Sequence, residues 1–161
     1  VSLDIGVKRK GFFGDAASTF PVGEVSPAAT KLMEATARAL EMGIEQSRPG
    51  KRVSDISAAI EHEATVCGFR VVRALVGHGI GRDLHEDPQV PNYGRAGEGP
   101  KLEEGMVLAI EPMVNAGTAD VLTLSDQWTV VTADRKLSAH FEHTVAITDN
   151  GPSVLSRVEA D

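Results

Sequence analysis

A pair of aspartates near the start of the chain constrains its fold more than any other feature of the sequence. Residues 1–20 predict a β-hairpin in which two stretches with strand character flank the polar turn Arg9-Lys10-Gly11. A turn centred between the first two residues of that tripeptide pairs Asp4 directly with Asp15, with Cβ atoms roughly 5 Å apart on one face. Carboxylates that close repel each other, and divalent cations turn the repulsion into a binding site. The sequence therefore predicts a hairpin that carries part of a metal centre.

Size and charge limit the classes of function. The chain has 161 residues and 42% hydrophobic content, which is enough for one compact core, so we expect a single domain over residues 1–161. The net charge is -7, and no basic run is longer than Lys8-Arg9-Lys10. This charge argues against nucleic acids and anionic membranes as partners and favours cations.

The cysteine content suggests the cellular compartment of the protein, and the first residues suggest whether its N-terminal portion is present. The single cysteine, Cys67, cannot form an internal disulfide, and no apolar run approaches the roughly 18 residues of a membrane helix. These features favour a cytoplasmic protein. Val1 already lies in a strand pattern, without an initiator methionine or a polar lead-in. We therefore expect the chain to lack an N-terminal portion.

Two consecutive helices follow the hairpin. Ser26-Pro27 is a helix start, because serine caps the first turn and proline fits within it, and helical spacing of apolar residues continues to Gln46. Pro49-Gly50 ends this pattern. A second amphipathic helix is predicted from Ser54, with Gly68 at its C-terminal end.

The remainder of the chain predicts strands and one long loop. The predicted strands are residues 69–76, 106–111, 128–132 and 141–148, and the predicted glycine- and proline-rich loop is residues 77–100. The Asn150-Gly151 turn closes the last hairpin region. A hairpin, two helices and several strands indicate an α+β fold, with helices gathered on one face of a mostly antiparallel sheet.

Three further residues suit a site begun by the aspartates. His78 lies among glycines directly after a predicted strand, where backbone can approach a ligand closely and imidazole can bind a transition metal. Glu111 ends an apolar strand, and Glu142 lies within another. A carboxylate in such a place is costly unless it is paired, and bound cations would pair both glutamates.

Simpler interpretations exist for each residue taken singly. The aspartates could flank a turn and point to solvent, His78 could be a turn residue, and Glu142 could pair with a lysine or arginine. Trp128 is equally well explained as core or as part of a binding pocket. The other histidines, His62, His140 and His143, are assigned structural or surface roles.

At these positions the sequence resembles the methionine aminopeptidases, specifically the bacterial type I form, over nearly the whole chain. Five residues stand in the order and spacing of that family's metal ligands: Asp4, Asp15, His78, Glu111 and Glu142. The stretch 77–81, His85 and residues 88–93 are also similar to the family signature. The resemblance implies a pita-bread fold that is incomplete at its N-terminus, with helices on the outer face of a curved sheet.

The resemblance also implies a mechanism. Asp4 would chelate one of two divalent ions (Mn, Co, Fe(II) or Zn), Asp15 and Glu142 would bridge both, and His78 and Glu111 would bind the other. The two ions would activate a water molecule for removal of the N-terminal methionine of nascent polypeptides. Glu111 would shuttle the proton to the leaving amine, and His85 would hydrogen-bond the substrate carbonyl.

The family pattern assigns the methionine side chain to a pocket that includes Trp128 and Leu84. Leu84 stands where the family often has phenylalanine, and Leu75 where it often has an aromatic residue, so we expect a reshaped pocket. The ribosome is a further partner that the resemblance suggests. Two alternatives remain open: a related Xaa-Pro aminopeptidase or prolidase, and a pita-bread module that binds peptides without catalysis.

Overall fold

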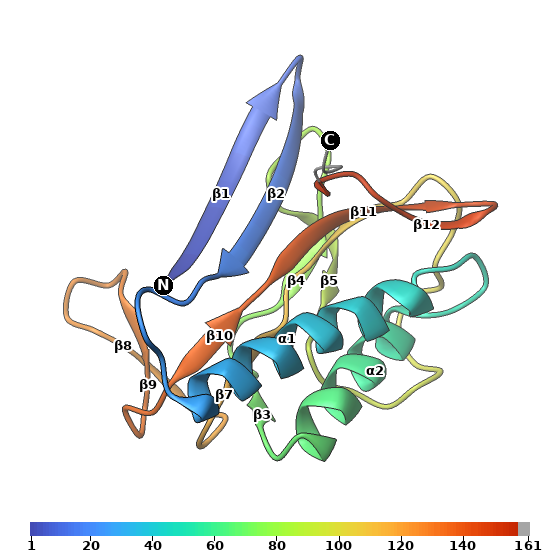
Figure 1. Cartoon of the computed structure of the whole chain (residues 1–161). Helices are drawn as coiled ribbons and strands as arrows, with labels where there is room; N and C mark the ends of the chain where they lie inside the picture. Colours follow the sequence, from blue (N-terminus) through green and yellow to red (C-terminus); the bar gives the residue numbers. More distant parts are fainter. Residues whose placement is uncertain (158–161) are drawn as a thin grey trace.

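The structure is a computed structural model that describes residues 1–157. Its helices are α1 (Pro27–Gln46) and α2 (Val53–Val66). Its strands are β1 (Ser2–Arg9), β2 (Phe12–Thr19), β3 (Arg70–Val71), β4 (Gly77–Gly79), β5 (Glu86–Val90), β6 (Val107–Ile110), β7 (Met113–Asn115), β8 (Val121–Thr123), β9 (Val130–Thr132), β10 (Ser138–His140), β11 (Glu142–Thr148) and β12 (Gly151–Val154). Figure 1 shows both helices on one side of the sheet, with the β1–β2 hairpin rising away from the helices.

One large sheet organises the fold. In the part of the chain that the structure describes, its strand order is β1-β2-β11-β6-β4-β5, with β12 paired to β11. A smaller sheet has the order β10-β7-β3, and β8 pairs with β9 alone. All of these pairings are antiparallel. The predicted α+β class, with a mostly antiparallel sheet and helices on one face, is confirmed.

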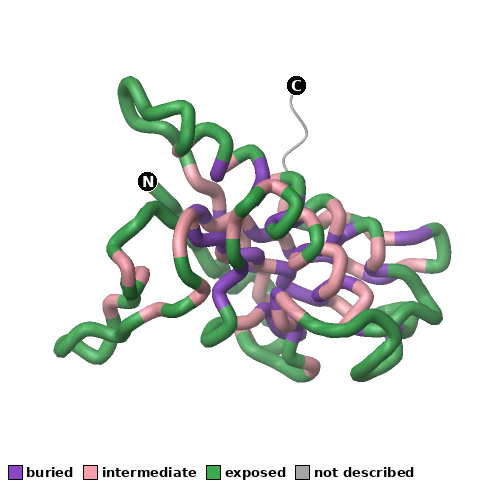
Figure 2. The backbone as a smooth tube through the Cα atoms, turned by 90° about the horizontal axis from the view of Figure 1, so that it is seen from below, coloured by how far each residue is buried: buried purple, intermediate pink, exposed green. Residues whose placement is uncertain are grey.

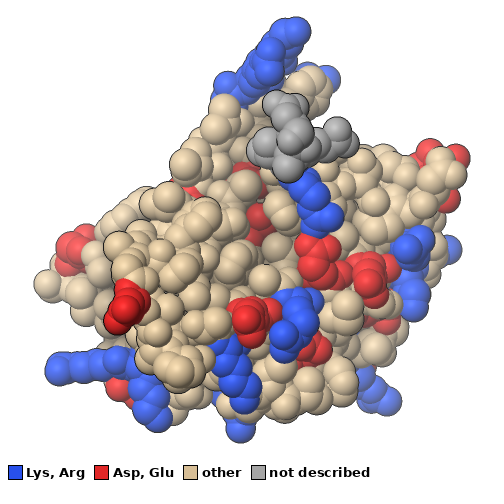
Figure 3. Space-filling view, viewed as in Figure 1, with Lys and Arg blue, Asp and Glu red and all other residues tan. Residues whose placement is uncertain are grey.

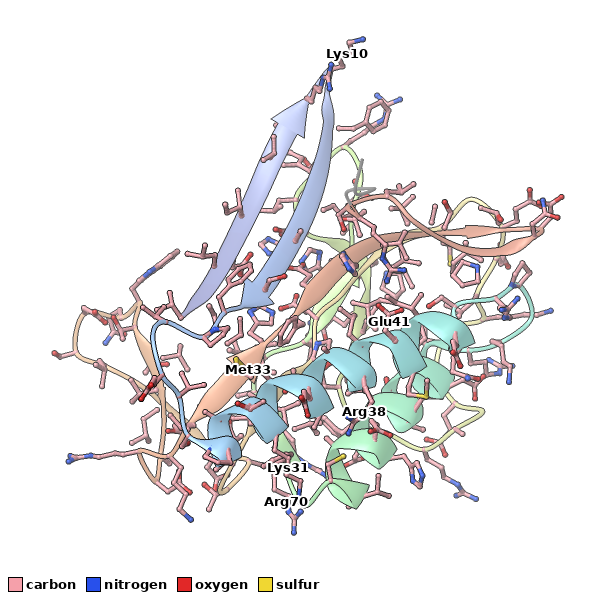
Figure 4. The ribbon with its side chains drawn as sticks, in the orientation of Figure 1. Lys10, Lys31, Met33, Arg38, Glu41 and Arg70 are labelled. Atoms are coloured by element: carbon pink, nitrogen blue, oxygen red, sulfur yellow. The ribbon has the colours of Figure 1, made fainter. Side chains whose placement is uncertain are left out.

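The first hairpin forms as predicted, but its predicted register is wrong. The two-residue turn is Lys10-Gly11, where both residues have positive φ (50° and 88°), as a type I′ turn requires. Asp4 therefore pairs with Ala17, and Asp15 pairs with Gly6. Moving the turn centre by one residue shifts each partner by two, so both aspartates stay on one face and become diagonal neighbours. Lys10 marks the hairpin tip in Figure 4.

Both predicted helices are present. The Ser26 hydroxyl accepts a hydrogen bond from the Ala29 N–H at 3.2 Å and caps α1 at the predicted residue. Helix α2 begins at Val53, one residue before the predicted start, because the Asp55 carboxylate accepts the Arg52 N–H at 2.8 Å. Gly68, with φ of +87°, follows the end of α2 as predicted.

The hydrophobic core lies between the two helices and the sheet. Its fully buried members include Ala35, Ala39, Ile56, Ile60, Leu108, Ile110, Val145 and Ile147. Figure 2 shows buried segments gathered at the centre of the body. The turn of the β1–β2 hairpin is exposed. The helices approach closely at Gly43, where an added Cβ would lie 2.9 Å from Ile60 Cδ1. We call this layer the helix-side core.

The outer surface of the helices carries mixed charges. Figure 3 shows lysine, arginine, aspartate and glutamate side chains interspersed over this face of the molecule. Arg38 of α1 forms an ion pair with Glu63 of α2 at 2.9 Å, and Arg157 pairs with Glu41. Within residues 1–157, neither helix is long and apolar enough to cross a membrane.

The long loop predicted for residues 77–100 is wrong in part, because it contains β4 and β5. The glycines of β4 permit close strand packing: an added Cβ at Gly77 would lie 2.4 Å from the Ala109 oxygen, and one at Gly79 would lie 2.2 Å from the Asp87 oxygen. Their role in the structure is therefore contact between strands. The predicted strand 69–76 shrinks to β3, whose two residues pair with β7.

The C-terminal strands were predicted with uneven success. Residues 106–111, 128–132 and 141–148 contain β6, β9 and β11, and the Asn150-Gly151 turn leads into β12, which pairs with β11. However, β9 pairs with β8 and takes no part in the main sheet. Strands β7, β8, β10 and β12 were not predicted, since each has only three or four residues.

Candidate metal centre

The five side chains predicted as metal ligands follow one another across the main sheet. Taken in sheet order, β1, β2, β11, β6 and β4 carry or lead directly into Asp4, Asp15, Glu142, Glu111 and His78. The register places them on one face of the sheet. Ala17 pairs with both Asp4 and Glu142, and His78 pairs with Ala109, two residues before Glu111. The alternate residues, such as Ile110, face the helix-side core.

Two groups of side chains on this face could each hold a metal ion. Asp15, His78 and Glu142 offer ligand atoms that all lie within 4.8 Å of one another. Asp4, His140 and Glu142 form a second such group. Because Glu142 belongs to both groups, the arrangement suits two neighbouring cations that share a carboxylate. Glu111 adjoins both groups, with its carboxylate oxygens 3.5 Å from His78 Nε2 and 3.6 Å from His140 Nε2.

Burial makes the charges of this centre costly. Glu142 is only 2% exposed, and burial, with Glu111, Asp15 and Asp4 nearby, raises its pKa to about 9. Burial and the two aspartates likewise raise the pKa of Glu111 to about 8, and burial followed by Asp4 raises the pKa of Asp15. Among residues 1–157, no lysine or arginine forms an ion pair with these carboxylates. Divalent cations would balance the negative charge of these carboxylates.

His78 is oriented for metal binding by its own strand. Its Nδ1 lies 2.9 Å from the Gly79 carbonyl oxygen, and a carbonyl only accepts hydrogen bonds. Nδ1 therefore carries the proton, and the Nε2 lone pair is free on the side of Glu111. The expectation that His78 is a simple turn residue is wrong, since His78 lies within β4 and is buried.

Asp15 is held by a threonine that bridges two strands. The Asp15 N–H donates to Thr144 Oγ1 at 2.8 Å, and the same hydroxyl donates to the Asp15 carbonyl oxygen at 2.8 Å. This hydroxyl stands where direct backbone pairing of β2 and β11 ends, two residues from Glu142. The threonine therefore fixes Asp15 relative to Glu142.

His140 is the residue of this centre that the sequence analysis missed. It was assigned a structural or surface role, yet it lies beside Glu111 and within ligand distance of Asp4 and Glu142. A signal was present in the sequence: His140 is two residues before Glu142, so strand periodicity places both on one face. The other two histidines fit their assigned roles, because His62 is exposed and His143 Nδ1 lies 2.9 Å from Ser156 Oγ.

His85 and Leu84 lie next to the centre. The His85 and His78 rings meet edge to face, with centroids 4.4 Å apart. His85 is exposed, and together with His78, Glu86 and Asp87 it lines an open hollow. Leu84 approaches Gly6, where an added Cβ would lie 3.2 Å from Leu84 Cδ1. The sequence motif that carries both residues therefore borders the carboxylates.

Trp128 is not a core residue. It lies between β8 and β9 and is 88% exposed, so its assignment to the core is wrong. Asp126 shapes this turn by accepting hydrogen bonds from the backbone N–H groups of Trp128 and Thr129. The placement of Trp128 in a methionine pocket stays a prediction.

The fold and the clustered side chains define a candidate metal centre on one face of an antiparallel sheet, and comparison with known proteins specifies the family. The model of metallopeptidase family M24 matches residues 1–149. The chain belongs to this family. It is 55% identical over 158 residues to methionine aminopeptidase 1 of Bacillus subtilis, covering 98% of this chain and 64% of that protein.

Solved structures agree with this assignment. Methionine aminopeptidase from Thermotoga maritima superposes with a TM-score of 0.95 at 47% identity, covering 98% of this chain and 63% of that one. The prolidase from Pyrococcus horikoshii superposes with a TM-score of 0.77 at 23% identity, covering 99% and 40%. The second likeness concerns the fold alone, and the predicted pita-bread fold is confirmed. The chain spans about 64% of the length of its Bacillus relative.

Proposed function

We propose that this chain carries the metal centre of an aminopeptidase that removes the N-terminal methionine from polypeptides. The observation that supports the proposal most strongly is the line of five ligand side chains across adjacent strands, with Glu142 common to two ligand groups. Identity of 47–57% to several methionine aminopeptidases supports the choice of substrate. We treat residues 1–161 as part of a single catalytic domain.

The residues present fit two divalent cations. Their donor set is four carboxylates and at least one imidazole with a free Nε2, which suits Mn, Fe(II), Co or Zn. Asp4 would hold one ion, His78 and Glu111 the other, and Asp15 and Glu142 would contact both. Bound there, such ions acidify a water molecule and polarise the scissile carbonyl.

The remaining roles fall to the chain's own side chains. Glu111 lies at the edge of the centre with 15% of its side chain exposed, so it can accept a proton from water and deliver it to the leaving amine. His85, exposed beside His78, would donate a hydrogen bond to the substrate carbonyl oxygen as negative charge develops. Leu84, next to Gly6, would contact the methionine side chain. Trp128 is assigned to the same pocket from the family pattern, and the ribosome and the cytoplasm stay predictions.

The proposal is tested with the full-length protein. After metal is removed by a chelator, Mn²⁺, Co²⁺ or Fe²⁺ is added under reducing conditions, and release of methionine from Met-Ala and Met-Gly peptides is measured. We expect release that requires the metal and that fails in Glu142→Gln. An exposed-site variant, His62→Ala, serves as the matched control and should retain activity.

Two results would contradict the proposal. Preferential cleavage of Xaa-Pro peptides would favour the prolidase alternative. Absence of metal binding in calorimetry, together with absence of methionine release, would favour a module that binds peptides without catalysis.

A further inference from the structure

The two ligand groups of the centre differ in whether all of their residues were predicted as metal ligands from the sequence. The group of Asp15, His78 and Glu142 contains only residues predicted as ligands. The group on the other side combines the predicted ligands Asp4 and Glu142 with His140, which was not predicted. The structure therefore offers one imidazole on each side of the shared Glu142.

The sheet itself fixes the position of His140. Its N–H donates to Thr19 Oγ1 at 2.9 Å, and the same hydroxyl donates to the His140 carbonyl oxygen at 2.8 Å. Thr144 holds Asp15 in the same way from the other strand. The backbone of His140 is thus anchored to β2, the strand that carries Asp15.

One ring nitrogen of His140, Nε2, is buried and has no hydrogen-bond partner among the described residues. The His140 side chain as a whole is 16% exposed. The nearest acidic oxygen in an ion-pair contact, Glu111 Oε2, lies 3.6 Å away, beyond hydrogen-bond length. A buried polar atom without a partner is costly, and a partner is expected. One ring nitrogen of His140 lies within 4.8 Å of ligand atoms of Asp4 and Glu142, so a cation there would give all three groups a partner.

We propose that His140 is a metal ligand, which binds through Nε2 the same divalent ion as Asp4 and Glu142. This inference rests on the proposed two-metal centre. It gives each of the two ions one imidazole ligand, His78 on one side and His140 on the other. Imidazole suits Co²⁺ and Zn²⁺ better than it suits Mg²⁺ or Ca²⁺, so the Asp4 side should select transition metals as the His78 side does.

The experiment uses Co²⁺ as the only added ligand of the metal-free full-length protein. Proton NMR of the Co²⁺-loaded protein detects strongly shifted, exchangeable N–H signals from each imidazole bound to the ion. We expect two such signals in the wild type. His140→Ala should lose one, His78→Ala should lose the other, and the matched control His62→Ala, on exposed surface, should keep both.

Calorimetric titration gives an independent readout. We expect two Co²⁺ sites in the wild type and a loss of about 10- to 100-fold or more in the affinity of one site in His140→Ala, with the other site unchanged. His140→Gln, which keeps a polar side chain, should show the same loss. If His140 merely positions Glu111, the wild type should show a single shifted imidazole signal, and His140→Ala should leave that signal in place.

The outcomes separate this inference from the proposed function. A single shifted imidazole signal in the wild type, or two sites of unchanged affinity in both His140 variants, overturns the role of His140 and leaves the two-metal centre standing. Absence of any Co²⁺ binding in the wild type overturns both. The wild-type spectrum decides the question even if a His140 variant fails to fold.

Discussion

The two faces of the main sheet bury side chains to nearly the same degree but with opposite chemistry. Ile110 on the helix-side core is 0% exposed, and Glu142 on the other face is 2% exposed. Around Ile110, apolar side chains of both helices fill the space. Around Glu142, burial and three further carboxylates raise its pKa. One face is stabilised by apolar packing, whereas the other gathers carboxylates whose ionised forms would be stabilised by bound cations.

The largest expected effect comes from breaking the ligand face. Glu142→Gln preserves shape but removes the carboxylate common to both ligand groups. Metal affinity should fall by more than about 100-fold, and peptidase activity should be lost. Because the pKa of Glu142 is raised to about 9, the metal-free protein already holds it protonated at pH 7, so its unfolding free energy should change by less than about 1 kcal/mol.

Isothermal titration with Co²⁺ and urea unfolding of the metal-free variant check these two values. A Glu142→Gln protein that retained tight metal binding would contradict the two-site arrangement. Strong destabilisation without metal would show instead that Glu142 supports the fold.

Substitutions in the helix-side core should lower the stability of the fold without depending on metal. Ile56→Ala removes a fully buried side chain of α2 and should lower the unfolding free energy by about 2–5 kcal/mol, equally with and without metal. Leu122→Ala, at a residue that is 55% exposed, is the control and should change it by less than about 0.5 kcal/mol. Urea unfolding in chelator and in Co²⁺ gives the comparison. If Ile56→Ala destabilised the protein only in chelator or only in Co²⁺, metal binding on one face would depend on packing on the other.

A pH series should sharpen the contrast between the faces. The folded-state pKa values of Glu111 and Glu142, about 8 and about 9, lie above the ordinary value of 4.5. The folded metal-free protein therefore holds more protons than the unfolded chain between those limits, and its stability should fall as pH rises from about 5 to 9.

Saturating Co²⁺ should reverse this slope, because metal binding requires deprotonated ligands and stabilises the folded state more as pH rises. Thermal unfolding at pH 6 and pH 8.5, in chelator and in Co²⁺, measures both slopes. Glu142→Gln is the matched control and should show a weaker decline without metal. Equal stability at the two pH values in chelator would contradict the pKa shifts.

The smallest effect concerns the contact between the helices. Gly43→Ala places a Cβ 2.9 Å from Ile60 Cδ1, so the close approach of α1 and α2 must loosen. Alanine favours a helix by about 1 kcal/mol over glycine, and overpacking costs about 1–3 kcal/mol, so a net loss of about 1 kcal/mol is expected. Gly43→Ala combined with Ile60→Val tests the cause, since the smaller side chain should recover part of the loss. Increased stability of Gly43→Ala would show that the Ile60 side chain can move to accept the added methyl group without cost.

Sequence reasoning succeeded where local patterns carry the information. The Ser26 cap, the Pro27 start and the terminal Gly68 specify helices through interactions within a few residues, and the helices formed there. It failed for β7, β8, β10 and β12, whose three or four residues are too few to show periodicity. The glycines of β4 were taken for a loop, because their role depends on contact with Ala109 and Asp87, which are distant in sequence.

The candidate metal centre, too, was predicted from the sequence only in part. The order and types of Asp4, Asp15, His78, Glu111 and Glu142 predicted a shared site, and the structure brings these side chains to one face. The sequence could not give the register of the first hairpin, which depends on where the turn closes. It also could not place His140 beside Glu111, since that proximity depends on the alignment of β10 with β2.

By itself, the sequence determined two amphipathic helices, a hairpin bearing two aspartates, and a set of acidic residues and one histidine too polar for an ordinary core. Only the tertiary structure decided that five strands would line up their ligands and that a second imidazole would join them. The physical reason is range: caps, turns and helical spacing act over a few residues, whereas the neighbours of a strand are chosen by pairing across the whole chain.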